Sequence, residues 1–356
     1  MAEKTYGGGT PTTSNEAFWN GNIPWIQSSD IVDGKLMGVE PRKYITQTGL
    51  NSSATQLVPK NSIAIITRVG VGKLAYMPFS YSTSQDFLSL SKLNTEPFFT
   101  VYACYKKLQS ELNTVQGTSI KGITKDELLA KTISVPVYSE QKQIGSFFAQ
   151  LDTLITLHQR KYEKLVNIKK SMLDKMFPKN GASVPEIRFK GFTDLWEQRK
   201  LGEMVDVCSG MDYKHLSEGD IPVYGTGGYM LSVNKALSYD RNAVGIGRKG
   251  TIDKPYILKA PFWTVDTLFY AIPKDSKNID FTFDVFQKVD WKKKDESTGV
   301  PSLSKIAINE TSISTPSKLE QERIGSFFRN LDTLITLHQR EHIKPILEVK
   351  RVKRNE

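Results

Sequence analysis

The sequence predicts an α+β protein in which two β-rich domains are separated by long helices and related by an internal repeat. The run Leu151–Arg160 occurs again, unchanged, at Leu331–Arg340. Between Glu140 and Arg160, 17 of 21 positions are identical to those found 180 residues later, which is too close a match to be chance. A block rich in β-branched and turn residues precedes each copy. We interpret the chain as a duplicated unit with pseudo-twofold character.

The repeated stretch is predicted to be a helix with one apolar stripe. Apolar residues recur at alternating spacings of three and four from Ile144 to Met176, which is the pattern of a coiled-coil seam. Pro178 and Gly181 follow the last turn, where such residues end helices. The nearest partner is the second copy, giving an antiparallel pair within the chain. Two separate amphipathic helices, each packed on its own domain, are the alternative.

Ten residues are predicted to form this seam or a subunit interface. They are Ile144, Phe148, Leu151, Ile155 and His158 in the first copy and Ile324, Phe328, Leu331, Ile335 and His338 in the second. The two histidines lie within the apolar stripe. We therefore expect them to pair with each other or with a polar neighbour rather than to take part in catalysis.

Composition favours a folded protein with an anionic partner. The 356 residues carry a net charge of +10, from 48 Lys and Arg against 38 Asp and Glu, and the excess is spread along the chain. This raises the expectation of nucleic-acid binding, although many basic proteins bind nothing acidic. Two cysteines give no disulfide framework, and neither a membrane span nor a secretory signal is recognisable. A cytoplasmic protein is expected.

The first block is predicted to be mostly β, with a few helices. Gly, Pro, Asn and Ser punctuate short apolar and β-branched runs, as expected for strands and hairpins. The predicted strands are Ile23–Ile26, Ser62–Thr67, Lys73–Met77 and Phe98–Tyr102. A helix is expected to begin near Thr124, because Glu127 stands at the capping-box position.

The second block repeats the outline of the first with different residues. Ile221–Tyr224 corresponds to Ile23–Ile26, and Thr264–Tyr270 corresponds to Thr83–Leu88. The helices, by contrast, hardly differ. Two divergent domains indicate two different targets read at a fixed separation, and two near-identical helices indicate a partner that binds twice.

No pattern in the sequence predicts an active site. Gly245-Ile-Gly-Arg-Lys-Gly250 matches the dinucleotide fingerprint, but Pro255 and β-branched neighbours argue against the helix that must follow. A turn between two strands, from which Arg248 and Lys249 project, is predicted instead. There is no P-loop, and no cysteine or histidine cluster has the spacing of metal ligands, so neither a metal site nor catalytic residues are expected.

The candidate DNA contacts lie in the loops of the two blocks. Ser, Thr, Gln and Arg side chains suit contact with base edges, and Lys and Arg suit contact with phosphates. A plain hairpin and solvated surface charge are the alternatives for these loops. The candidates are Trp25, Gln27, Ser28, Ser29, Arg68 and Lys73 in the first block and Tyr224, Thr226, Tyr229, Arg248, Lys249 and Lys254 in the second.

With these residues in view, the chain resembles the DNA-specificity subunits of type I restriction–modification systems. The resemblance rests on the Gly8–Asn15 and Ile23–Ile26 segments, the paired Glu-Gln-x-x-Ile-Gly-Ser-Phe-Phe helices and Trp196–Gly202. It implies two target-recognition domains that each read one half of a bipartite site. It also implies helices that set the spacer and dock two methyltransferase subunits, to which restriction subunits attach. S-adenosylmethionine, ATP and Mg would be used by those partners, with no cofactor in this subunit.

On this basis five segments are expected. They are a first recognition domain at 1–136, a central helix at 137–178, a linker at 179–190, a second recognition domain at 191–316 and a distal helix at 317–356. The alternative interpretation is a coiled-coil scaffold whose β domains bind proteins. Salt dependence separates the two, because phosphate contacts make DNA affinity fall steeply with salt.

Two departures from the family pattern stand out. The family begins its first recognition domain with a segment like Trp196–Gly202, and this sequence starts just inside it. The second helix diverges after Arg340, where Pro345 is expected to kink or end it. Both features suggest a shortened or rearranged subunit with weaker assembly at one end.

Overall fold

The computed structural model describes residues 1–114, 122–179, 182–274 and 277–352. The chain divides into two units, unit 1 at Met1–Leu157 and unit 2 at His158–Glu356. The division falls within the long helix α4 (Tyr138–Lys175), which therefore contributes its first part to unit 1 and the remainder to unit 2. Among the described residues, no helix is long and apolar enough to cross a membrane.

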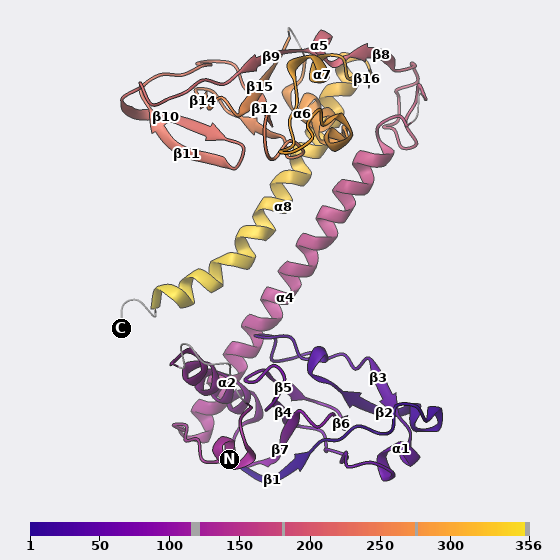
Figure 1. Ribbon diagram of the computed structural model, residues 1–356, viewed down its shortest axis with the longest axis vertical. Helices are drawn as coiled ribbons and strands as arrows, with labels where there is room; N and C mark the ends of the chain where they lie inside the picture. The colour runs from indigo at the N-terminus through magenta and orange to yellow at the C-terminus, as the bar shows by residue number, and fades with distance from the viewer. Residues whose placement is uncertain (115–121, 180–181, 275–276, 353–356) are drawn as a thin grey trace. The chain divides into compact units, whose positions relative to one another are not determined.

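Unit 1 is built on a four-stranded antiparallel sheet of order β1-β7-β4-β5 and a three-stranded sheet of order β3-β2-β6 (Figure 1). The second sheet contains a parallel pair, since Trp25 of β2 lies opposite Ser82 of β6. Its elements are β1 (Ala2–Gly7), β2 (Trp19–Ile26), β3 (Lys43–Ile45), α1 (Gln47–Asn51), β4 (Ser62–Ile66), β5 (Leu74–Met77), β6 (Ser82–Thr83), β7 (Phe87–Leu93), α2 (Pro97–Thr114) and α3 (Lys125–Leu129), with short 3-10 turns at Glu16–Phe18 and Ser28–Asp30.

Unit 2 repeats this plan with a four-stranded sheet of order β13-β12-β15-β9 and a three-stranded sheet of order β11-β10-β14. Here too one pair is parallel, with Tyr224 of β10 opposite Thr264 of β14. Its elements are β8 (Glu197–Lys200), α5 (Leu201–Met204), β9 (Val205–Ser209), β10 (Glu218–Gly225), β11 (Gly228–Val233), β12 (Ala243–Gly247), β13 (Tyr256–Leu258), β14 (Trp263–Thr264), β15 (Leu268–Pro273), α6 (Ile279–Lys288), α7 (Lys305–Asn309), β16 (Ser312–Thr315) and α8 (Lys318–Val352), with a 3-10 turn at Trp291–Lys294.

The two blocks are therefore repeats in structure as well as in sequence. The pairing β1·β7 corresponds to β9·β15, β4·β7 to β12·β15, and the parallel pair β2·β6 to β10·β14. The repeat predicted from the sequence is confirmed. Unit 2 also contains a two-stranded sheet, formed by β8 and β16.

Local capping explains where the short helices begin. The Thr124 hydroxyl accepts the Glu127 N–H at 3.2 Å, and the Glu127 carboxylate accepts the Thr124 N–H at 2.8 Å, so the predicted capping box is confirmed. The prediction of a strand at Phe98–Tyr102 is wrong, because these residues lie in α2. Pro97 is the first residue of that helix, a position that tolerates proline, and the Glu96 carboxylate accepts the Phe99 N–H at 2.6 Å.

The repeated glycine lets each long helix pack closely on its own unit. A Cβ at Gly145 would stand 2.6 Å from the backbone nitrogen of Phe99 at the start of α2. A Cβ at Gly325 would stand 2.7 Å from the backbone nitrogen of Phe281 at the start of α6. The glycine of the Ile-Gly-Ser-Phe-Phe repeat therefore allows each long helix to cross a second helix closely, since a side chain at Gly145 or Gly325 would collide with backbone atoms.

Within unit 2, the second part of α4 runs antiparallel to α8. Nδ1 of His158 lies 3.2 Å from Nδ1 of His338, so the predicted pairing of the two histidines is confirmed. Nζ of Lys169 lies 2.5 Å from Oδ1 of Asp332, and Phe177 contacts Phe328 with ring centroids 6.3 Å apart. Along these contacts the residue numbers rise in α4 and fall in α8, as expected for antiparallel helices. Regular coiled-coil packing remains a prediction.

The helix α8 continues past Pro345 to Val352. Of the two outcomes expected at Pro345, an end of the helix is therefore wrong, and a kink stays a prediction. Proline removes one backbone N–H and disturbs one turn, but a kink rather than termination is the usual result when helical residues continue on both sides.

Candidate nucleic-acid interface

In unit 1, the loop after β2 and the turn between β4 and β5 are held to the same short segment, Ser84–Asp86. The Ser84 N–H donates to the carbonyl of Ile26 at 2.9 Å, which fixes the start of the loop carrying Gln27 and Ser28. The Thr67 N–H donates to the carbonyl of Asp86 at 2.8 Å, which fixes the turn carrying Arg68. Candidates that are 40 residues apart in sequence therefore lie on neighbouring loops.

Unit 2 uses the same two hydrogen bonds. The Val265 N–H donates to the carbonyl of Tyr224 at 3.0 Å, and the Arg248 N–H donates to the carbonyl of Thr267 at 2.8 Å. The predicted turn between strands at residues 248–255 is confirmed, because β12 ends at Gly247 and β13 begins at Tyr256. A Cβ at Gly247 would lie 2.1 Å from the carbonyl oxygen of Thr251, so this glycine is required by the turn rather than by a phosphate.

The candidate residues of unit 1 differ in how accessible they are. Ser29 and Arg68 are exposed, while Gln27, Ser28 and Lys73 are half-buried. Trp25 is buried, and its indole N–H donates to the carbonyl of Gly9 at 3.0 Å. Its ring therefore supports the loop from behind rather than presenting a face to solvent.

Unit 2 offers a more aromatic and more basic surface. Arg248, Lys249 and Lys254 are exposed, and the Tyr229 side chain is 64% exposed beside half-buried Tyr224 and Thr226. Arg248 lies 5.8 Å from the centroid of Phe269, a cation–π contact that orients the guanidinium.

Two groups adjust the charge and hydrogen bonding of this surface. The Tyr256 hydroxyl donates to the carbonyl of Gly225 at 2.6 Å. Burial, reinforced by Tyr224, raises the pKa of Tyr256, so the phenol remains a donor that fixes the end of β10. The Lys292 ammonium, 2.8 Å from Asp253, holds the pKa of that carboxyl below its usual range. Asp253 is thus a fixed negative charge in the turn that carries Lys254.

The structure adds candidates that sequence reasoning missed. Gln85 in unit 1 and Asp266 in unit 2 are exposed at equivalent positions, between the two loops described above. The Thr10 hydroxyl donates to Oε1 of Gln85 at 2.6 Å. Lys43 is exposed, and its Nζ stands 5.7 Å and 5.8 Å from the ring centroids of Trp19 and Trp25. The sequence did hold one signal for Gln85 and Asp266, because each lies two residues after a threonine, Thr83 or Thr264, that is matched between the two blocks.

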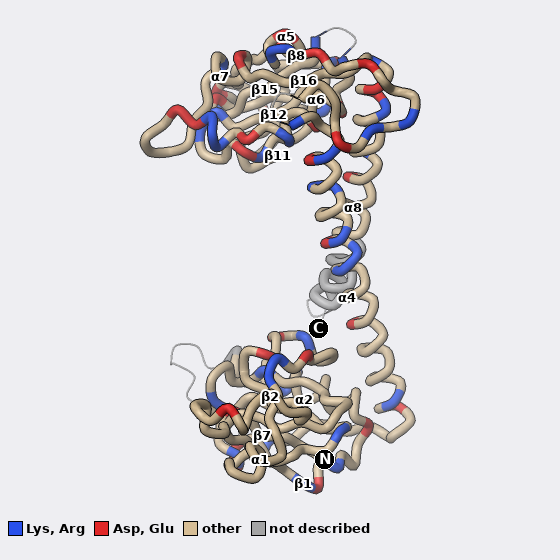
Figure 2. Tube along the Cα trace, turned by 90° about the vertical axis from the view of Figure 1, so that its right-hand side faces the viewer, with Lys and Arg blue, Asp and Glu red and all other residues tan. Residues whose placement is uncertain are grey.

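Charge is distributed rather than concentrated. Figure 2 shows lysines and arginines interspersed with acidic residues in both units. In the described part of the chain, no group of three or more His, Cys, Asp or Glu side chains is placed to hold a metal ion. The arrangement offers hydrogen-bonding and basic side chains on paired loops, which suits recognition of an anionic polymer.

The chain thus presents one fold twice, and the loops of the two units carry different side chains. The chain belongs to the family described as the type I restriction modification DNA specificity domain, whose model matches residues 1–167 and 193–347. The two matched regions follow the two repeats.

Relatives and solved structures agree with this family. The chain is 30% identical over 179 residues to the EcoR124I/EcoR124II specificity subunit of Escherichia coli, covering 45% of this chain and 44% of that subunit. It is 24% identical to the EcoprrI specificity subunit of Escherichia coli, covering 97% of this chain and 87% of the subunit. The chain thus spans less than half of the first relative. The fold is similar to the type I S subunit of M. genitalium, with a TM-score of 0.69 at 18% identity over 98% of this chain and 91% of that one.

Proposed function

We propose that this chain is the non-catalytic DNA-specificity subunit of a type I restriction–modification complex. Family membership and the repetition of one fold with two different loop sets support this function. Unit 1 would read one half of a bipartite site through Gln27, Ser28, Ser29, Arg68 and Lys73. Unit 2 would read the other half through the loops that carry Tyr224, Thr226, Tyr229, Arg248, Lys249 and Lys254.

The proposal is carried by a contrast between the two units: the hydrogen bonds that hold the loops are shared, whereas the side chains that the loops expose differ. The hydrogen bonds that hold the loops are the same in both units, whereas exposed Gln85 is replaced by Asp266. Gln is a bidentate partner for adenine, and Asp accepts from the amino group of cytosine. Two units that differ in this way would favour different half-sites. The scaffold alternative, in which the β-rich units bind proteins, gains no support from this contrast.

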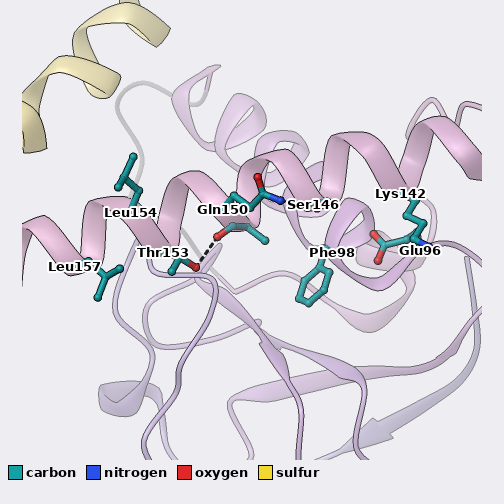
Figure 3. Close-up of a pocket in the computed structure, with 9 residues that line it drawn as sticks. Glu96, Phe98, Lys142, Ser146, Gln150, Thr153, Leu154 and Leu157 are labelled. Atoms are coloured by element: carbon teal, nitrogen blue, oxygen red, sulfur yellow. Dashed lines mark hydrogen bonds between the residues drawn. The ribbon is translucent and has the colours of Figure 1, made fainter.

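The helices would dock methyltransferase subunits through an apolar pair that recurs in both copies. Leu154 and Leu157 project from α4 (Figure 3) and are 46% and 57% exposed. Their repeats Leu334 and Leu337 in α8 are 44% and 48% exposed. The first pair lines a groove of about 490 Å³ in unit 1, together with Phe98 and Lys142. Exposed apolar pairs at matching positions suit a partner that binds twice.

The catalytic steps would take place in the partner subunits. Methylation with S-adenosylmethionine and cleavage driven by ATP and Mg would take place in methyltransferase and restriction subunits, while this chain selects the DNA. The helices would act as a ruler that fixes the number of unspecified bases between the half-sites.

The test is to co-express the chain with its methyltransferase partner and to map methylated bases across a host genome. The proposal expects one bipartite motif with a fixed gap. A motif with only one defined half would show that one of the two units does not recognise DNA. A stable complex without methylation would overturn the proposal that this chain recognises a DNA sequence. Replacing Leu154 and Leu334 together with Asp should abolish co-purification of the methyltransferase. The control, Thr156→Asp with Thr336→Asp, places the same charges at repeated positions of the two helices, and Thr156 does not line the groove, so co-purification should stay intact.

A further inference from the structure

Residues 291–303 of unit 2, a 3-10 turn followed by a loop, are anchored in the core at both ends. Trp291 is 1% exposed, and its indole N–H donates to the carbonyl of Phe286 at 2.7 Å. At the other end Leu303 is 4% exposed and belongs to the same buried cluster. The residues between these two anchors are therefore presented from a rigid base.

The Asp295 carboxylate closes the loop on itself. Its Oδ1 accepts the N–H and the hydroxyl of Ser297 at 3.0 Å and 2.8 Å, and the N–H of Ser302 at 2.9 Å. These hydrogen bonds hold the pKa of Asp295 below its usual value, so the closing group stays ionised at neutral pH. The Glu296 N–H also donates to the carbonyl of Ser302, at 3.2 Å. The loop is therefore a closed ring with a defined conformation.

This loop is joined edge to edge to the turn that carries the basic candidates of unit 2. The Gly250 N–H donates to the carbonyl of Pro301 at 2.8 Å, and the Leu303 N–H donates to the carbonyl of Arg248 at 3.0 Å. An antiparallel bridge between Lys249 and the loop lies between these two hydrogen bonds. The candidate DNA surface of unit 2 therefore extends across the turn into the loop.

The tip of the loop is exposed and carries no charged side chain. Val300 is 66% exposed, and Thr298, Gly299 and Pro301 are exposed as well. A Cβ at Gly299 would meet no atom within 4 Å, so the chain leaves the space beside the tip open. An uncharged tip gains no ionic attraction from phosphates, whereas apolar side chains and the threonine methyl group contact the methyl group of thymine.

Three lysines precede this uncharged tip in the chain. Lys292, Lys293 and Lys294 of the 3-10 turn are all exposed. Lys292 pairs with Asp253 at 2.8 Å and Lys293 with Asp290 at 3.2 Å, and ion pairs of such exposed lysines contribute little stability, so a phosphate replaces them at small cost. Because phosphate contacts position a protein on DNA and base contacts specify the sequence, lysines beside an uncharged tip suit a DNA-reading loop.

We propose that the loop Asp295–Ser302 is a base-reading element of unit 2, which places Thr298 and Val300 against thymine methyl groups of double-stranded DNA. The lysines of the 3-10 turn contact the neighbouring phosphates. The ring closed by Asp295 holds the tip in one conformation, which lowers the entropic cost of ordering it on DNA. This assignment rests on the proposed function, and it adds to that function a further reading loop and the base feature that the loop recognises.

The test uses the complex of the full chain with its methyltransferase and fluorescent duplexes that carry the bipartite motif defined by methylation mapping. Thymines of one half-site at a time are replaced by uracil, which lacks only the 5-methyl group. In one half-site, uracil should weaken binding of the unchanged chain about threefold for each methyl group that loses an apolar contact. Thr298→Ser with Val300→Ala removes methyl groups from the tip and keeps the hydroxyl. This variant should bind the thymine and uracil forms of that half-site nearly alike, and the other half-site should be unaffected.

A second variant adds an atom instead of removing one. Gly299→Ala places a methyl group in space that the chain leaves open, so it should weaken binding of the cognate duplex about tenfold without lowering the melting temperature. The matched control is Gly7→Ala in unit 1, where a Cβ would also meet no atom within 4 Å. Neither glycine has the left-handed backbone that favours glycine, and the control should change neither quantity.

The outcomes separate the loop from the proposed function. If the difference between thymine and uracil is the same for the tip variant and the unchanged chain in both half-sites, the loop does not read bases, while the bipartite motif stands. If the unchanged chain yields no motif, the proposed function and the loop assignment both fail. If Gly299→Ala prevents co-purification of the methyltransferase, the tip contacts protein rather than DNA, and the loop assignment is wrong.

Discussion

The two copies of Ile-Gly-Ser-Phe-Phe have the same sequence and different surroundings. In α8, Phe328 is fully buried against Phe177 and Phe281. In α4, Phe148 is 38% exposed and touches Tyr102, with ring centroids 5.2 Å apart. The glycine contact is the same in both copies, so the helix crossing is set by local sequence. Burial of the phenylalanines is set by which distant segment covers them.

The difference teaches that the repeated sequence determines the helix and the point where it crosses its unit. It does not determine how much each side chain on the helix contributes to the free energy of unfolding. In unit 2 the covering residues come from the chain that follows α4, including Phe177, Phe189 and Trp196. Identical mutations in the two copies should therefore have unequal effects. Paired substitutions turn this contrast into a series of measurements.

The largest expected difference is between Phe328→Ala and Phe148→Ala. Removing a fully buried phenylalanine leaves a cavity and should cost about 3–5 kcal/mol in the free energy of unfolding. Phe148→Ala removes a ring that is already partly hydrated and should cost roughly 1 kcal/mol. Urea denaturation measures the loss, and hydrogen exchange of α8 and α4 peptides assigns it to a unit. Equal losses would show that Phe148 is buried in solution.

The second pair concerns the repeated glutamate. Arg188→Ala leaves the buried Glu320 carboxylate without its two-point partner and should destabilise unit 2 by about 3 kcal/mol. Glu140→Gln, on the exposed copy, should change stability by no more than about 0.5 kcal/mol. Thermal unfolding of the two variants compares them directly. A large effect of Glu140→Gln would mean that its carboxylate has a partner in the folded chain.

The third pair predicts a pH dependence that is stronger in unit 2. Burial raises the pKa of Asp284 well above its usual value; nearby Lys169 opposes this, while Asp332 and Asp280 add to it. Because the folded state holds this proton more tightly than the unfolded state, stability should fall as pH rises from the unfolded pKa through the folded one. Asp284→Asn should flatten that slope and stabilise unit 2 at neutral pH.

Asp152 in α4 is a partly buried aspartate of unit 1 with which this pH effect can be compared, although it is not the repeat of Asp284. Burial also raises its pKa, but a hydrogen bond from the Tyr102 hydroxyl at 2.6 Å opposes the shift. The slope lost in Asp152→Asn should therefore be smaller. Unfolding followed by urea titration between pH 4 and pH 8 tests both variants, and a slope unchanged by Asp284→Asn would contradict the prediction.

Much of the framework could be predicted because its signals are local. The repeat, the capping box at Thr124, the pairing of His158 with His338 and the turn after Gly247 each follow from spacing or from residue type. The strand predicted at Phe98–Tyr102 failed because β-branched and aromatic residues also suit a helix that packs on a sheet. There, Val101, Cys104 and Leu108 are buried at helical spacing.

The candidate site was predicted less completely than the fold. Arg68 and Arg248 were named as candidates from their type and place in the sequence, but the position of their turns is fixed by hydrogen bonds to Asp86 and Thr267, about 20 residues further along the chain. Trp25 was placed among the candidate contacts because of its type, although its ring is buried. Exposure depends on the whole unit, which periodicity within one strand does not encode.

The smallest expected effect compares the two turn arginines. If Arg248 contacts a phosphate, Arg248→Ala should weaken DNA binding by about 1 kcal/mol on every sequence and reduce the salt slope by about 1. If it reads a base, the loss should be confined to the cognate half-site and reach about 1–3 kcal/mol. Arg68, one position further along the corresponding turn of unit 1, is the arginine to compare, and Arg68→Ala should act on the other half-site in the base-reading case. Titrations of the methyltransferase complex with cognate and half-substituted duplexes at several salt concentrations distinguish these outcomes. Equal affinity of both variants and the unchanged chain for every duplex would remove the two turns from the interface.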